Sequence, residues 1–206
     1  MERREILRLL GASLSLSALE SLSPAEILAF GREVHARLEP GEDDRRYIFS
    51  ALDPHQNRTV TAVAELILPE TDTPGAKAAR VNEFIDLILA EWFSPEERRR
   101  FLEGLAELDG KSRELSGKSV VDSAPEQQME LLKAQEAEAI AARAALDQNE
   151  IEEGASSRSR ANRHFFDVIK WLTLFGYFTS EVGMRDELAY EVFPVSYSGC
   201  APFARG

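Results

Sequence analysis

The chain has 206 residues, of which 44% are hydrophobic and 29% charged, a balance typical of one globular domain rather than a disordered chain. Its formal charge of -12 argues against nucleic acid and anionic membranes as main partners, because both would repel it. The single cysteine excludes an internal disulfide, and no apolar run reaches the ~20 residues that a membrane-spanning helix needs.

The first 36 residues resemble an export segment. Arg3 and Arg4 precede two apolar residues and a further arginine, which is the pattern of a twin-arginine signal, and a mildly apolar, serine-rich run follows. Glu20 interrupts that run, and residues 34–36 match a cleavage site only loosely. The alternative is an amphipathic N-terminal helix whose paired arginines face water. We therefore predict a targeting segment or N-terminal helix over residues 1–36 and a helical domain over residues 37–206.

Ser23, Pro24 and Glu26 form a capping signature that predicts a short helix ending near Leu38. Two helices joined by a short turn follow over residues 60–92, and each has an apolar stripe at 3–4-residue spacing. Asp53, Pro54 and Gln56 form the capping signature that begins the first of them. Pro69 ends the first helix, because its ring disfavours α geometry in the preceding residue. The two helices are expected to pack as a hairpin. Asp72 and Thr73 are expected to hydrogen-bond the backbone of the turn between them.

Two further helices are predicted after this pair. Ser94 and Glu97 form a second capping box, and the helix that they begin is expected to end at Gly110 and Gly117. Residues 125–160 are rich in alanine and glutamate and predict a long exposed helix followed by a linker.

The C-terminal part of the chain is more apolar. Residues 162–175 predict a helix that is buried on most sides, either at the centre of the domain or shared with another subunit. Residues 188–206 have no helical period and predict an extended arm. Its aromatic residues give it more apolar surface than a free tail should expose. We predict that these two segments contact a partner through Phe165, Phe166, Trp171, Phe175, Tyr177, Tyr190, Phe193, Tyr197, Cys200 and Phe203.

Cys200 has two interpretations. A lone cysteine in an exported protein suggests a free thiol or a disulfide to a partner, and this one lies on the predicted arm. The alternative is a small buried hydrophobic residue, as free cysteines often are.

No pattern in the sequence predicts chemistry in this chain. It has no G-x-G-x-x-G motif between a strand and a helix, no C-x-x-C-H haem motif, and three scattered histidines without metal-ligand spacing. We therefore predict no catalytic, cofactor-binding or metal-binding residue. The residues by themselves indicate a single all-α domain with a terminal segment at each end.

Three segments in order resemble the gluconate 2-dehydrogenase subunit 3 family. The first is the helix end at residues 66–69 with the turn Thr71–Ala76. The second is the helix from Val81 through Ile85 with the later pair Gly104 and Leu105. The third is the helix at residues 165–180 with the tail at residues 199–200, so that the resemblance spans about residues 59–203.

This resemblance implies a non-catalytic small subunit of an exported sugar or sugar-acid dehydrogenase, similar to the small subunits of glucoside 3-dehydrogenases. It implies a large partner subunit of the glucose–methanol–choline type that holds FAD, and a c-type cytochrome with haem c as electron acceptor. The small subunit of such a complex supports the folding and export of the large one, so a periplasmic location by the twin-arginine route is expected. The alternative is a stand-alone helical binding protein of the cell envelope.

Overall fold

The computed structural model describes residues 23–38, 47–153 and 163–188. Within these ranges the chain forms helices and no strands, which confirms the predicted all-α class. The elements are α3 (Pro24–Leu38), α4 (Pro54–Ile67), α5 (Val81–Glu91), α6 (Pro95–Ser116), α7 (Pro125–Glu153), α8 (Phe165–Thr179) and the short π-helix η2 (Gly183–Glu187). The predicted export arginines and the predicted arm beyond residue 188 lie outside the described residues.

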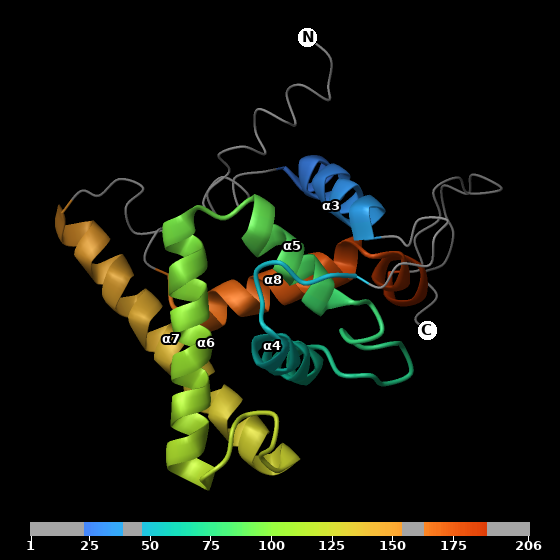
Figure 1. The fold of residues 1–206 in the computed structure, drawn as a ribbon. Coiled ribbons are helices and arrows are strands. Elements are labelled where there is room, and N and C mark those ends of the chain that lie inside the picture. Colours follow the sequence, from blue (N-terminus) through green and yellow to red (C-terminus); the bar gives the residue numbers. More distant parts are fainter. Residues whose placement is uncertain (1–22, 39–46, 154–162, 189–206) are drawn as a thin grey trace, which may run out of the picture.

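Helix α8 is the centre of the domain. It runs through the middle of the bundle, between α3 and α4, and also packs on α5, α6, α7 and η2 (Figure 1). The apolar composition of this helix is explained by that position, because helices surround it on most sides. The sequence predicted this helix either at the centre of the domain or at an interface with another subunit, and the structure places it at the centre.

Helix α5 supplies the most deeply buried side chains. Phe84, Ile85, Ile88 and Leu89 are all 0% exposed. The ring of Phe84 meets that of Phe175 on α8 edge to face, with 5.3 Å between the centroids. Burial of each such side chain contributes about 1.5–3 kcal/mol, so α5 makes a large contribution to the stability of the core.

Capping residues set the helix starts as predicted. Helix α4 begins with a capping box at Asp53, and α6 begins with one at Ser94. In each box the N-cap side chain accepts a backbone N–H of the first turn, and the side chain three residues later accepts the N–H of the N-cap residue. Helix α6 ends at Gly117, whose φ of 73° is left-handed. The prediction that Gly110 also marks this end is wrong: the helix continues through it to Ser116, because one glycine costs only about 1 kcal/mol in a helix that is packed along its length.

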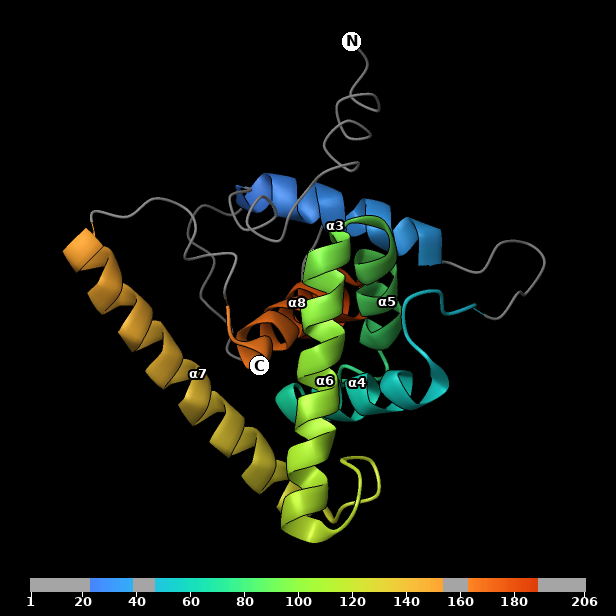
Figure 2. The same cartoon turned by 60° about the vertical axis from the view of Figure 1, so that its left-hand side comes forward.

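The α4–α5 pair differs from the expected hairpin. Helix α4 ends at Ile67, just before Pro69, as predicted. The two helices, however, cross steeply instead of running antiparallel (Figures 1 and 2). The connection over residues 68–80 is too long for a tight hairpin, and it ends at Arg80, a non-glycine residue with a left-handed φ of 53°.

Helix α3 belongs to this core. Phe30, Val34 and Leu38 are buried, and the Phe30 ring lies against those of Trp92 and Phe175. The predicted boundary at residue 36 therefore falls inside a packed helix, as does the loosely matched cleavage site.

One half-buried histidine joins α3 to α8. His35 Nε2 donates to the carbonyl of Gly176 at 2.9 Å. Burial lowers the pKa of His35, which favours the neutral ring. The contact therefore fastens α3 to the central helix without a buried charge.

Helix α7 has the predicted bounds but is not exposed on all sides. Leu131, Leu132, Gln135 and Ala139 form a buried stripe. Ion pairs on either side of this stripe join Glu138 to Lys111 of α6 and Glu136 to Lys170 of α8. The first half of α7 is thus part of the bundle, which its low density of large apolar residues did not indicate.

Candidate functional site

The aromatic residues predicted as partner contacts on α8 are largely used inside the domain. Phe166, Phe175 and Tyr177 are 5%, 6% and 3% exposed. Phe165 and Trp171 are half-buried and pack against the core. Other helices of this chain therefore cover most of the apolar side chains of α8. The apolar composition of α8 is thus no evidence that Phe166, Phe175 and Tyr177 contact a partner. The other predicted contacts, Tyr190, Phe193, Tyr197, Cys200 and Phe203, lie outside the described residues.

The turn of the first resemblance segment is organised by Glu65. Its carboxylate accepts the backbone N–H of Glu70 at 3.0 Å and that of Lys77 at 2.8 Å, which closes the connection between α4 and α5. Gly75 leaves the room for this contact, since a Cβ there would lie 2.4 Å from Glu65 Oε1. The sequence predicts this role for Asp72 and Thr73, and it gives no local signal for Glu65, which lies on the preceding helix.

Two side-chain contacts join this turn to the end of α8. The Tyr177 hydroxyl donates to the carbonyl of Pro74 at 2.7 Å, and Thr73 Oγ1 donates to Glu187 of η2 at 2.7 Å. Burial raises the pKa of the Tyr177 phenol, and nearby carboxylates add to this effect. The phenol therefore remains a hydrogen-bond donor at neutral pH. The first and third resemblance segments are thus held together directly.

The second resemblance segment meets the same helix through close contacts at glycine. A Cβ at Gly104 of α6 would lie 2.5 Å from the Phe165 ring. A Cβ at Gly176 of α8 would lie 2.8 Å from the ring of Phe84 on α5. Both glycines allow helices to approach more closely than any side chain would permit. All three segments therefore interlock around α8.

A polar cluster joins α4 to α6. His55 Nε2 lies 2.5 Å from Asp109 Oδ2, and the same carboxylate accepts from Arg113 at 3.0 Å and from the N–H of Val120 at 2.9 Å. Burial acts to raise the pKa of Asp109, but the hydrogen bonds from His55 and Val120 outweigh it and leave the pKa below its usual range. No local spacing in the sequence pairs His55 with Asp109, because 54 positions separate the two residues.

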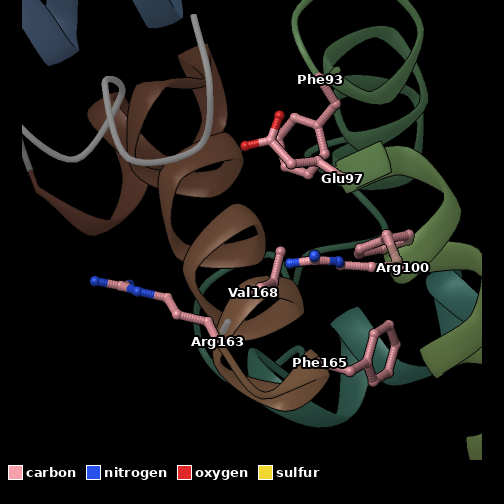
Figure 3. Close-up of a pocket in the computed structure, with 7 residues that line it drawn as sticks. Phe93, Glu97, Arg100, Arg163, Phe165 and Val168 are labelled. Carbon is pink, nitrogen blue, oxygen red and sulfur yellow. The ribbon is translucent and has the colours of Figure 1, made fainter. Parts of the chain in front are cut away.

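A small pocket opens between α6 and the start of α8. Phe93, Phe101, Phe165 and Val168 supply its apolar walls, and Arg100 extends across it toward Val168 (Figure 3). Its volume of about 60 Å³ is far below the ~300–1,000 Å³ of small-molecule sites. A flavin would not fit it. The pocket has room for a single side chain.

Neither a metal site nor a membrane span is found in the part of the chain that the structure describes. No three histidine, cysteine or carboxylate side chains gather there as metal ligands. None of the described helices is both long enough and apolar enough to cross a bilayer.

The described residues define an all-α protein whose motif residues build a helical scaffold around one central helix. The family model for gluconate 2-dehydrogenase subunit 3 matches residues 54–195, and the chain belongs to this family. Searches of curated proteins and of solved structures give no significant match. The match includes the turn, the glycine contacts and the whole of α8. Membership indicates an accessory subunit of a dehydrogenase complex.

Proposed function

We propose that this chain is the non-catalytic small subunit of an exported, FAD-dependent sugar or glycoside dehydrogenase complex. The single observation that carries the proposal is the family match over residues 54–195. The partner is a large subunit of the glucose–methanol–choline type, and a c-type cytochrome accepts the electrons. FAD bound in the large subunit supplies the redox chemistry, and the small subunit supports folding, export and stability of that partner.

The geometry supports a binding role for this chain. Gly104, Gly176 and Tyr177 lie in segments that resemble the family, and each one holds helices or a turn in place. Glu65, directly before the first of these segments, does the same for the turn. Such residues determine shape, and a subunit that acts by binding depends on its shape. The pocket between α6 and α8 is too small for a flavin, which agrees with a proposal that places the cofactor in the partner.

If this chain carries the export signal for the complex, then removing that signal should change the location of both subunits. When Arg3 and Arg4 are both replaced by lysine, this chain and the flavoprotein large subunit should both remain in the cytoplasm, because the address for both lies on this chain. Cell fractionation followed by immunoblotting of each subunit measures the effect.

The matched control for this experiment is Arg32→Lys, which changes an exposed arginine of α3. This variant should leave both subunits in the periplasm. If the large subunit reaches the periplasm in the double-lysine strain, it has its own route and the export role is contradicted.

A further inference from the structure

Helix α3 lies at one edge of the described bundle and packs mainly on α5 and α8 (Figures 1 and 2). The contacts that join α4, α5, α6, α7 and α8 to one another do not involve it. The family match begins at residue 54, so the matched part of the chain is the bundle without α3. A helix in such a position can open locally while the rest of the domain stays folded.

His35 lies where α3 meets the two helices beneath it. Its ring stacks on that of Phe84 of α5, with 5.0 Å between the centroids. Its Nε2 lies 2.9 Å from the carbonyl oxygen of Gly176 and 3.2 Å from the hydroxyl oxygen of Thr179, both on α8. One turn earlier on α3, Gly31 approaches the same threonine closely. His35 is therefore in contact with both helices that hold α3.

These contacts determine which ring nitrogen of His35 carries the hydrogen. The Gly176 carbonyl can only accept, so the hydrogen is on Nε2. The Thr179 hydroxyl donates to the carbonyl of Phe175 at 2.7 Å, so it too accepts from Nε2. A second proton would have to bind Nδ1, which has no hydrogen-bond partner among the described residues. Protonation would thus add a charge to a half-buried ring without adding a hydrogen bond within this contact.

The charged groups around His35 do not compensate such a charge. Arg80, which directly precedes α5, acts on the ring as a second positive charge, and its guanidinium donates to the carbonyl of Leu38 at 3.2 Å. Helix α8 has the ionisable side chains Asp167 and Lys170, both well before Gly176, and the Tyr177 phenol, which donates to Pro74. Other charged side chains of these elements pair with each other: Glu33 and Glu91 with Arg37, Glu83 with Arg80, and Glu181 with Arg185.

The docked position of α3 therefore disfavours the charged form of His35. Burial lowers the pKa of the ring below its ordinary value of about 6.5, and Arg80 adds to this effect, while the hydrogen bond to Gly176 opposes it without outweighing burial. When α3 is released into water, the pKa of the ring returns to about 6.5. As the pH falls below that value, the released form binds a proton more readily than the docked form, so release becomes more favourable. The effect ends once the pH is below the pKa of the docked ring.

We propose that His35 is a pH-sensitive contact: protonation of its ring releases α3 from α5 and α8, while the bundle from α4 to α8 stays folded. Above about pH 6.5 the neutral ring keeps α3 docked. Below it, release uncovers the apolar face of α3, which consists of Phe30, Val34 and Leu38, and the parts of α5 and α8 beneath it. This inference goes beyond the proposed function, because it concerns the domain itself and is independent of the partner that the chain binds.

Hydrogen exchange of the full chain tests the release of α3, since it reports the opening of each segment separately. Exchange is measured at several values between about pH 7.5 and about pH 5, on either side of the ordinary imidazole pKa, and each rate is divided by the intrinsic rate at that pH. The opening constant of α3 in the wild type should rise by up to about tenfold for each pH unit below about 6.5, because the ring titrates there only in the released form. The opening constants of α6 and α8 should change far less.

Two substitutions separate His35 from the other titrating groups. His35→Gln places an amide nitrogen near the position of Nε2 and does not titrate, so the opening constant of α3 should be the same across this pH range. His55→Gln is the matched control, because His55 joins α4 to α6 through Asp109. This variant should keep the wild-type pH dependence of α3.

Three results would overturn the proposal. The first is a pH dependence of α3 that is absent from the wild type, or is the same in His35→Gln as in the wild type. The second is a loss of protection that spreads equally over all the helices, since that is global unfolding. The third comes from NMR titration of the histidine rings of the wild type, which needs no substitution: the His35 ring should titrate below about pH 6.5, and a value at or above it contradicts the proposal.

Discussion

Replacing Asp86 with alanine is expected to lower the free energy of unfolding by about 3–5 kcal/mol, the largest effect of any single polar substitution considered. The side chain of Asp86 is 0% exposed and lies on helix α5, which packs against the central helix α8. It accepts the N–H groups of Ser50, Ala51 and Leu52 at 3.0, 2.9 and 2.7 Å, and the Tyr47 hydroxyl at 2.7 Å. Alanine would leave these donors without their acceptor, and buried unpaired donors are costly.

Urea denaturation of the full chain, followed by circular dichroism, measures this effect. Asp86→Asn should have an intermediate effect, because an amide keeps one oxygen but loses the second acceptor and the charge. The control is Asp72→Ala, since that carboxylate is exposed on the turn and its loss should change the free energy of unfolding by less than about 0.5 kcal/mol. An Asp86→Ala variant within 1 kcal/mol of wild type, by the same rough scale, would show that the segment from Tyr47 to Leu52 does not depend on this carboxylate.

Two glycine-to-alanine substitutions should have effects of opposite sign. Gly31→Ala on α3 should destabilise the chain by about 1–3 kcal/mol, because the new Cβ would lie 2.3 Å from Thr179 Cβ on α8 and force the two helices apart. Gly110→Ala on α6 should stabilise it by about 0.5–1 kcal/mol, because nothing lies within 4 Å of that Cβ and alanine favours the helix.

Thermal unfolding of both variants beside the wild type measures this pair. The two changes add the same methyl group within a helix, so their difference isolates the contact between α3 and α8. If Gly31→Ala were as stable as Gly110→Ala, α3 would not pack on α8 as closely as the structure shows, and its place in the domain would be in doubt.

The helices of this fold could be predicted from local patterns. The capping boxes at Asp53 and Ser94, the proline at position 69 and the apolar stripe of α5 all act over a few residues, so their effect is visible in sequence. The burial of α8 followed from its apolar composition, but the composition did not show whether a domain core or a subunit interface buries it. Gly110 shows the limit of such patterns, because packing along α6 outweighs the local cost of a glycine.

The interactions that position these helices were not predictable in the same way. Asp86 lies within an apolar stripe and pairs with a segment about 35 positions earlier, and His55 meets Asp109 across 54 positions. Glu65, and not Asp72 as expected, accepts hydrogen bonds from the backbone of the turn, because the turn folds back against the end of α4. Such contacts depend on the tertiary arrangement, which no spacing in one sequence encodes directly.

The apolar residues of α8 that were predicted as partner contacts have a physical explanation within the domain. Aromatic residues on α8 suggested an interface by their number, but Phe166, Phe175 and Tyr177 are covered by the other helices of this chain. The large apolar side chains that are exposed in the described residues lie on several segments instead: Ile48, Leu115, Met129, Ile140 and Leu188. Exposure in the fold, rather than hydrophobicity alone, separates a core helix from a docking helix.

Affinity purification of the tagged chain from its own host, with an absorbance spectrum of the eluate, tests the central claim most directly. The proposed subunit role predicts a larger partner with flavin bands at roughly 370 and 450 nm that bleach when the sugar substrate is added, because the cofactor chemistry lies in that partner. The same chain produced alone should be colourless. A colourless single protein from the native host would contradict the subunit role and favour a stand-alone helical binding protein.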